Sequence, residues 1–133
     1  MNNDRSLYFA YGTNLNKKLF LKKYKKAKYL KKYTLRNYEV VFRSGYGIPD
    51  LQKRLGSNVK GVIYEIDKLI EKKLDKYEDF PNLYVKRFFK LKKKRIMYYY
   101  MKKKSPIRKP AKYYLKIMMS GYRQCGFKKL RLT

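Results

Sequence analysis

The stretch at residues 7–15 constrains the fold of this chain more than any other part of its sequence. An apolar and aromatic run, Leu7–Tyr11, stops at Gly12-Thr13-Asn14, and a pattern of Lys, Leu and Phe follows. This order indicates a buried strand, a tight turn and the start of a helix. Such a turn directs several backbone N–H groups and the positive end of a helix dipole at one point. We therefore predict that the loop holds an anionic group of a small molecule.

The rest of the chain alternates between strand and helix patterns. Asn16 and Asp67 stand where side chains can cap helices, and Gly126 can end the last helix. Lys92 to Arg95 can turn a hairpin, and Gly and Pro punctuate a loop that contains Asp50. We expect strands at 7–11, 35–43, 60–66, 84–91 and 96–101, helices at 17–26, 68–77 and 111–125, and a loop at 44–57. This order predicts a mixed α/β fold of the α+β class.

Length and composition favour a globular protein. The 133 residues, of which 44% are hydrophobic, fit a single domain over residues 1–133 with a core of its own. No apolar run approaches the roughly 18 residues that a membrane-spanning helix needs, and Met1–Arg5 lacks the build of a signal peptide. Cys125 is the only cysteine, so no internal disulfide is possible. We therefore expect a cytoplasmic protein.

The absence of histidine limits the chemistry. The sequence contains no His and one Cys, which excludes Ser-His-Asp and Cys-His catalysis and removes the commonest metal ligand. We expect neither a metal nor another cofactor. Proton transfer would have to rely on a carboxylate, a tyrosine, a lysine or water.

The net charge of +28 would attract phosphate polymers through salt-sensitive forces. Lysine pairs and runs occur along the whole chain, which is typical of a compositional bias, but the shortage of acidic residues leaves a preference for positive charge. The run Tyr98-Tyr99-Tyr100 alternates on a strand and fits core and surface packing better than a base-stacking platform. Nonspecific binding of polyanions or nucleic acid therefore stays a hypothesis.

Glu78 is the best candidate among the nine acidic residues for a catalytic carboxylate. It stands with Asp79 where a helix breaks, between Tyr77 and the turn at Phe80-Pro81. Partial burial there would raise its pKa toward the range in which a carboxyl group exchanges protons near neutral pH. The alternative, a surface ion pair with one of the 37 basic side chains, is the commoner use of such a residue.

Four segments in the right order resemble the gamma-glutamylcyclotransferase family. The family's Tyr-Gly-Ser-Asn-Leu loop is matched by Tyr11–Leu15, and its Leu-Asp-x-x-Glu-Gly segment by Leu74–Asp79, with Tyr84 following. Gly56–Glu65 and Pro110–Leu115 match two further segments of the family. The chain departs from the family pattern at Thr13, where Ser is usual, and at Asp79, where Gly is usual; Asp can adopt a positive φ at modest cost.

The resemblance implies a small mixed, barrel-like sheet with flanking helices and a cofactor-independent enzyme. Its reaction is the release of 5-oxoproline from a gamma-glutamyl amino acid or amine, by attack of the α-amine on the side-chain carbonyl. Glu78 would act as general acid and base. The substrate-binding residues implied are the loop, whose N–H groups would hold the glutamyl carboxylate, and three tyrosines that shape the pocket: Tyr11, Gly12, Thr13, Asn14, Leu15, Tyr84 and Tyr114.

Two alternatives to this enzyme stay open at this point. The chain could be a basic nucleic-acid-binding module on a cyclotransferase fold that has lost its activity. It could also act on a gamma-glutamyl group carried by a larger, anionic molecule that its positive surface would attract. A monomer and a homodimer are both compatible with the sequence.

Overall fold

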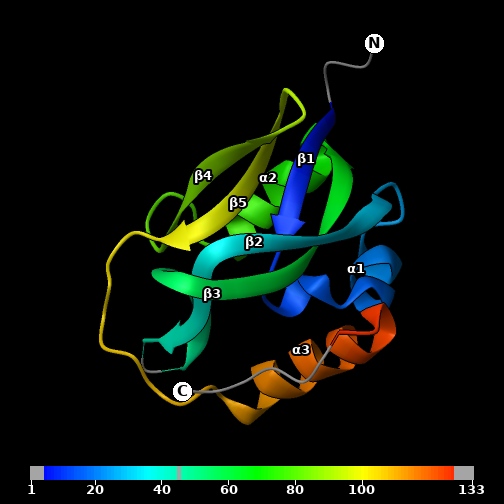
Figure 1. Ribbon diagram of the computed structural model, residues 1–133. Coiled ribbons are helices and arrows are strands. Elements are labelled where there is room, and N and C mark those ends of the chain that lie inside the picture. Colours follow the sequence, from blue (N-terminus) through cyan, green and yellow to red (C-terminus); the bar gives the residue numbers. More distant parts are fainter. Residues whose placement is uncertain (1–4, 45, 128–133) are drawn as a thin grey trace.

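The computed structural model describes residues 5–44 and 46–127. Within these ranges the chain forms five strands, three α-helices and one 3₁₀ turn (Figure 1). The elements are β1 (Arg5–Ala10), η1 (Thr13–Leu15), α1 (Lys17–Lys23), β2 (Lys28–Arg43), β3 (Ile48–Asp67), α2 (Lys68–Tyr77), β4 (Tyr84–Leu91), β5 (Lys94–Met101) and α3 (Lys112–Cys125). The predicted mixed α/β class is confirmed.

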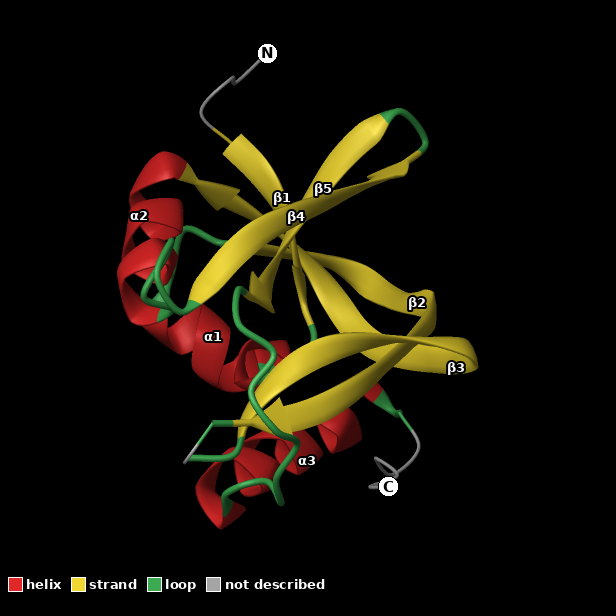
Figure 2. Cartoon of the chain, turned by 90° about the vertical axis from the view of Figure 1, so that its left-hand side faces the viewer, coloured by secondary structure: helices red, strands yellow, loops and turns green. Residues whose placement is uncertain are grey.

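The five strands form one mixed sheet in the order β2-β3-β1-β5-β4. β1 lies in the centre, antiparallel to β3 and parallel to β5. Its residues Tyr8, Phe9 and Ala10 are all buried, which explains why this strand is a continuous apolar run rather than an alternating one. Figure 2 shows α1 and α2 on one side of the twisted strands.

The prediction of a loop at 44–57 is wrong for most of these residues. β3 begins at Ile48 and pairs with β2, which itself begins at Lys28 rather than at residue 35. Pro49 is tolerated because the pairing of β1 with β3 is confined to residues 62–67 of β3, so Pro49 lies beyond it. Gly56, at φ 87°, donates its N–H to the side chain of Asn37, where the strand pairing is irregular. Gly56 therefore marks an irregularity within a strand and not a loop.

Asp50 illustrates the same correction. We expected it in a loop, but it lies in β3 and is fully buried. Its carboxylate accepts hydrogen bonds from Arg43 Nε at 2.9 Å, Lys104 Nζ at 2.8 Å and the Met101 N–H at 2.8 Å. This buried cluster ties the ends of β2, β3 and β5 together.

Other element ends differ by a few residues. β1 ends at Ala10, one residue before the predicted end, and α1 ends at Lys23 rather than near residue 26. β5 begins at Lys94, so the hairpin turn consists of Lys92 and Lys93, both at positive φ. Long-range pairing extends β2 and β5 beyond the residues that local pattern assigns to them.

The predicted helix ends at Asn16, Asp67 and Gly126 are confirmed. The side chains of Asn16 and Asp67 accept hydrogen bonds from the N–H groups of Leu19 and Ile70, and Gly126 follows α3 at φ 72°. The Asn16 side chain also donates to the Ile117 carbonyl oxygen and accepts from Gln124 Nε2, so the cap of α1 is joined to α3. This junction lies directly after the loop of interest.

Two apolar clusters pack against the sheet. The larger, which contains Leu15, Tyr64 and Leu74, includes residues of the helices, and the smaller contains Phe9, Leu51 and Tyr98. Among the described residues, no helix combines the length and apolar character needed to cross a bilayer.

Gly121 lets α3 approach the loop closely, and Gly121→Ala is expected to destabilise the protein. A Cβ at this position would lie 2.4 Å from Leu15 Cδ1 and 2.8 Å from Asn16 Cα. The shifts needed to make room for this Cβ should lower the free energy of unfolding by about 1–3 kcal/mol. Urea denaturation measures this loss. Ser120→Ala at the neighbouring position is the control and should change that free energy by less than about 0.5 kcal/mol. Equal stability of both variants would contradict close packing here.

Candidate active site

Glu78 is placed by the end of α2. Its N–H donates to the Leu74 carbonyl oxygen at 2.8 Å, and the next residue, Asp79, turns the chain at φ 50°. The Asp79 carbonyl then accepts from the N–H groups of Asn82 and Leu83, which closes the predicted turn. The positive φ explains why the family pattern has Gly here and how Asp replaces it.

In the loop at residues 12–15, the carbonyl oxygens of residues 12–14 accept hydrogen bonds, but the N–H groups of these three residues do not donate any within the described part of the chain. The Leu15 N–H donates to the Gly12 carbonyl oxygen at 3.2 Å, and the Tyr64 hydroxyl donates to the Asn14 carbonyl oxygen at 2.8 Å. Within the described part of the chain, the N–H groups of Gly12, Thr13 and Asn14 have no acceptor. Gly12 also packs against Pro49, whose Cγ would lie 2.9 Å from a Cβ at this position.

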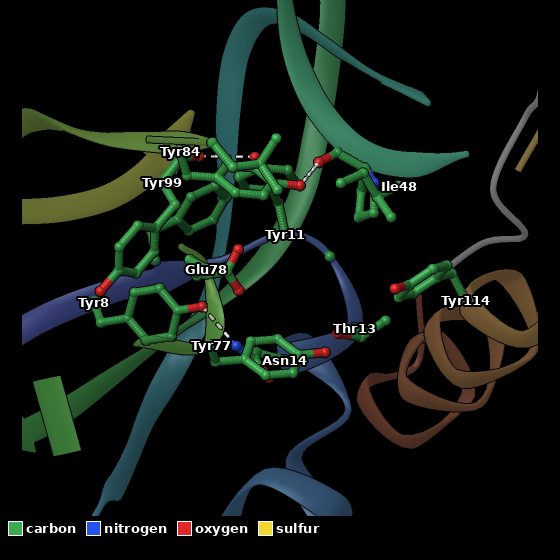
Figure 3. A pocket seen from close by; sticks show the side chains of 14 residues that line it. Tyr8, Tyr11, Thr13, Asn14, Ile48, Tyr77, Glu78, Tyr84, Tyr99 and Tyr114 are labelled. Carbon is green, nitrogen blue, oxygen red and sulfur yellow. Dashed lines mark hydrogen bonds between the residues drawn. The ribbon is translucent and has the colours of Figure 1, made fainter. Parts of the chain in front are cut away.

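Glu78 and this loop line the same cavity of about 170 Å³. Figure 3 shows the Glu78 carboxyl group inside the cavity, with Thr13 and Tyr114 across the open space from it. The cavity is lined by Tyr8, Phe9, Tyr11, Gly12, Thr13, Asn14, Ile48, Pro49, Tyr77, Glu78, Leu83, Tyr84, Tyr99 and Tyr114. Segments from β1, β3, the α2–β4 turn, β5 and α3 thus converge on one space.

Burial raises the pKa of Glu78 to about 7, which makes its carboxyl group able to accept and release a proton near neutral pH. No described cation forms an ion pair with it. Burial, and then the charge of Glu78, raises the pKa of Tyr8 and of Tyr84, so both hydroxyl groups stay protonated. The cavity therefore contains one titratable carboxyl group among neutral hydroxyl donors.

The tyrosine hydroxyl groups are fixed by further hydrogen bonds. Tyr11 donates to the Tyr99 carbonyl oxygen at 2.7 Å, and Tyr84 donates to the Pro49 carbonyl oxygen. Asn14 Nδ2 donates to the Tyr8 hydroxyl at 3.0 Å, so the Tyr8 hydroxyl acts as the acceptor in this bond. These bonds hold the cavity wall in one arrangement.

The structure brings together seven of the eight residues named from the sequence: Tyr11, Gly12, Thr13, Asn14, Glu78, Tyr84 and Tyr114 all line the cavity. Leu15 does not line it. Its side chain is fully buried, and its N–H is already bonded to the Gly12 carbonyl oxygen. Leu15 instead packs in the core beneath the loop.

Sequence reasoning missed several lining residues, above all Tyr8, Tyr77 and Tyr99. Tyr8 lies within the apolar run, and Tyr99 lies within the three consecutive tyrosines. Because side chains alternate along a strand, Tyr99 must face away from its two neighbours. The alternation does not indicate which face of the sheet carries the site. The contact between the Tyr8 and Tyr99 rings, 5.9 Å between centroids, depends on the pairing of β1 with β5.

No group of three His, Cys, Asp or Glu side chains suited to a metal ion occurs in residues 5–44 and 46–127. The carboxylates near the cavity are used otherwise. Asp75 accepts a hydrogen bond from the Tyr99 hydroxyl at 2.6 Å and pairs with Lys86 at 3.0 Å.

Comparison with known protein families shows to which family the chain belongs. Residues 8–123 match the model of the family described as gamma-glutamyl cyclotransferase, AIG2-like. The chain belongs to this family. The match includes both the loop at 12–14 and Glu78, so the resemblance inferred from four short segments is confirmed over most of the sequence. A search of curated protein sequences found no match.

Solved structures share the fold of this AIG2-like gamma-glutamyl cyclotransferase family member. An uncharacterized protein from Homo sapiens matches with a TM-score of 0.78 and 22% identity, over 93% of this chain and 82% of that one. A gamma-glutamyl cyclotransferase matches with a TM-score of 0.76 and 22% identity, over 92% and 80%. An AIG2-like protein from Mus musculus matches with a TM-score of 0.63 and 23% identity, over 78% and 82%.

Proposed function

We propose that this protein is an active cyclotransferase that releases 5-oxoproline from a gamma-glutamyl amino acid or amine. The observation that carries the proposal is the shared cavity, which is lined by Glu78 and by residues 12–14, whose N–H groups have no acceptor among the described residues. Family membership supports the same reaction class. We keep the expected cytoplasmic location as part of the proposal.

The loop would position the substrate. In our proposal the N–H groups of Gly12, Thr13 and Asn14 hold the α-carboxylate of the glutamyl group, because three donors without acceptors form a site for an oxyanion. The attacking amine and the carbonyl carbon belong to the same substrate molecule. Once the substrate is folded into a ring-like conformation, the reaction is intramolecular, so positioning supplies much of the rate acceleration.

Glu78 would move the protons. Its carboxylate takes a proton from the α-ammonium group, and the amine then attacks the side-chain carbonyl carbon. The C–N bond to the leaving amine breaks as that nitrogen receives the proton from Glu78. Over the whole reaction the α-nitrogen gives up two protons and the leaving nitrogen gains two, so no proton is consumed and Glu78 can relay each in turn.

The test is incubation of the full chain with a panel of gamma-glutamyl amino acids and amines, free and attached to an anionic carrier, with detection of 5-oxoproline. We expect product from at least one free substrate. A folded protein that forms no product across the panel would contradict the proposal. Turnover of carrier-bound substrates alone would favour the larger, anionic substrate instead.

The pH dependence of this activity is a separate prediction. Because the base must be deprotonated and the pKa of Glu78 is about 7, we expect kcat/KM to rise with pH and to be half-maximal near pH 7. Below that, the rate should fall by about tenfold per pH unit. Initial rates from pH 5.5 to 8.5, with circular dichroism as a control for folding, measure this. A midpoint near the usual carboxyl value would contradict the role of burial.

A further inference from the structure

A second hollow lies on the other face of the β4–β5 hairpin from the cavity. Successive side chains on a strand point to opposite faces, and accordingly Tyr99 lines the cavity of Glu78, whereas Tyr98 and Tyr100 line a space of about 500 Å³. Its other walls come from β2, β3, β4 and the segment after β5. Figure 2 shows the β4–β5 hairpin and the β2–β3 pair diverging from the centre of the sheet. We call this space the basic pocket.

Four cations line the basic pocket: Arg43, Lys53, Arg87 and Lys104. Arg43 and Lys104 share the buried carboxylate of Asp50, at 2.9 and 2.8 Å, so this group of three keeps one net positive charge. Lys53 and Arg87 are exposed and have no carboxylate partner among the described residues. The pocket therefore carries about three uncompensated positive charges.

Aromatic rings fix part of this charge at the pocket wall. Arg87 lies 4.6 Å and Lys104 3.3 Å from the centroid of the Tyr100 ring, which are cation–π distances. Tyr38 adds a half-buried ring to the same wall. Arg87 and Lys104 are thus held on the same ring, and of these two Asp50 pairs only with Lys104, so the positive charge of Arg87 has no anion beside it among the described residues. Such an arrangement is suited to bind an anion from solution.

We propose that the basic pocket binds single-stranded nucleic acid, with backbone phosphates on Lys53, Arg87 and Lys104. A nucleotide chain presents a phosphate and a flat, partly apolar base in every repeat, which matches a wall made of cations and tyrosine rings. An acidic peptide offers carboxylates without the flat group. A flexible single strand can place one nucleotide into a hollow of this size, whereas a duplex is too rigid to do so. The binding would accompany the proposed enzymatic activity and would not depend on Glu78.

The experiment uses the full chain and a fluorescently labelled single-stranded oligonucleotide, with anisotropy read from low to physiological salt. The test variant combines Lys53→Gln with Arg87→Gln, and its matched control combines Lys72→Gln with Lys73→Gln on the exposed face of α2. Both remove two charges from exposed sites. Each lost phosphate contact should reduce the salt slope by about 0.7, so the test variant should lose about 1.4 in slope and roughly tenfold or more in affinity at 0.1 M salt.

The control should lose less than twofold in affinity, and Glu78→Gln should bind like the unaltered protein. Equal weakening by both double variants, or by neither, would show that diffuse charge binds the oligonucleotide and would overturn the proposal. So would equal affinity for an abasic oligomer, for a duplex, or for polyglutamate. Formation of 5-oxoproline by the test variant, measured separately, tells a failure of this proposal from a failure of the proposed function.

Discussion

Glu78→Gln is expected to reduce the rate of 5-oxoproline formation by about 10²- to 10⁴-fold, the usual contribution of a positioned general acid–base group. Glutamine keeps the size of the side chain but cannot accept the proton of the α-ammonium group. KM should change little, because the loop at residues 12–14 rather than Glu78 holds the substrate carboxylate in our proposal. Steady-state kinetics on the best substrate of the panel measure both constants.

A measurement of the melting temperature should show that the loss of activity in Glu78→Gln does not come from misfolding. The folded pKa of Glu78, about 7, lies above its ordinary value, so the folded protein binds the proton more tightly than the unfolded chain. Ionisation of Glu78 therefore destabilises the fold as pH rises from 4.5, the ordinary pKa, toward 7, and the loss levels off above about pH 7. At pH 8 the variant should melt at the same temperature as the unaltered protein or at a higher one.

Asp79→Asn, which keeps a residue tolerant of positive φ, is the neighbouring control and should stay active. A tenth or more of the activity remaining in Glu78→Gln would exclude Glu78 as the base.

Asp50→Asn is expected to cost about 3–5 kcal/mol of unfolding free energy, the range for removing one partner of a buried ion pair. Asp50 is fully buried, and the Arg43 side chain that it pairs with is 7% exposed. The amide would bring N–H donors against donors of Arg43 and Lys104 and would leave the buried guanidinium group uncompensated. The free energy from urea denaturation, followed by circular dichroism, measures the loss.

Glu39→Gln provides the matched control on β2. Glu39 accepts from Arg54, whose side chain is 55% exposed, and such exposed pairs contribute about 0–1 kcal/mol. Asp50→Asn should also lower catalytic activity, since the adjacent Pro49 lines the cavity and its carbonyl oxygen accepts from Tyr84. If the two variants were equally stable, the cluster around Asp50 would not hold β2, β3 and β5 together.

Much of the candidate site could be predicted because its signals are local. Gly12 follows the end of β1, Asn16 caps the next helix, and Pro81 with Asp79 ends α2 next to Glu78. Each of these residues acts on the backbone within a few positions, so a short window of sequence is sufficient. The direction in which a side chain points is less accessible: Leu15 follows the loop immediately, yet it turns into the core.

The tyrosines of the cavity could not be selected in the same way. The chain has 16 of them, and core packing and site lining require the same residue type. Tyr8 and Tyr99 line the same cavity as Glu78 because β1 pairs with β5 in parallel, a contact between segments about 90 positions apart. Nothing within either segment specifies that partner.

By itself the sequence determined the alternating strands and helices, the helix caps and the turn that presents Glu78, because these follow from backbone preferences over a few residues. Tertiary structure alone decided that residues 48–57 form a strand, that Asp50 is buried and that the loop at 12–14 faces Glu78. A strand gains its hydrogen bonds from a distant partner, so Pro49 and Gly56 could act as strand residues only once β2 lay beside them.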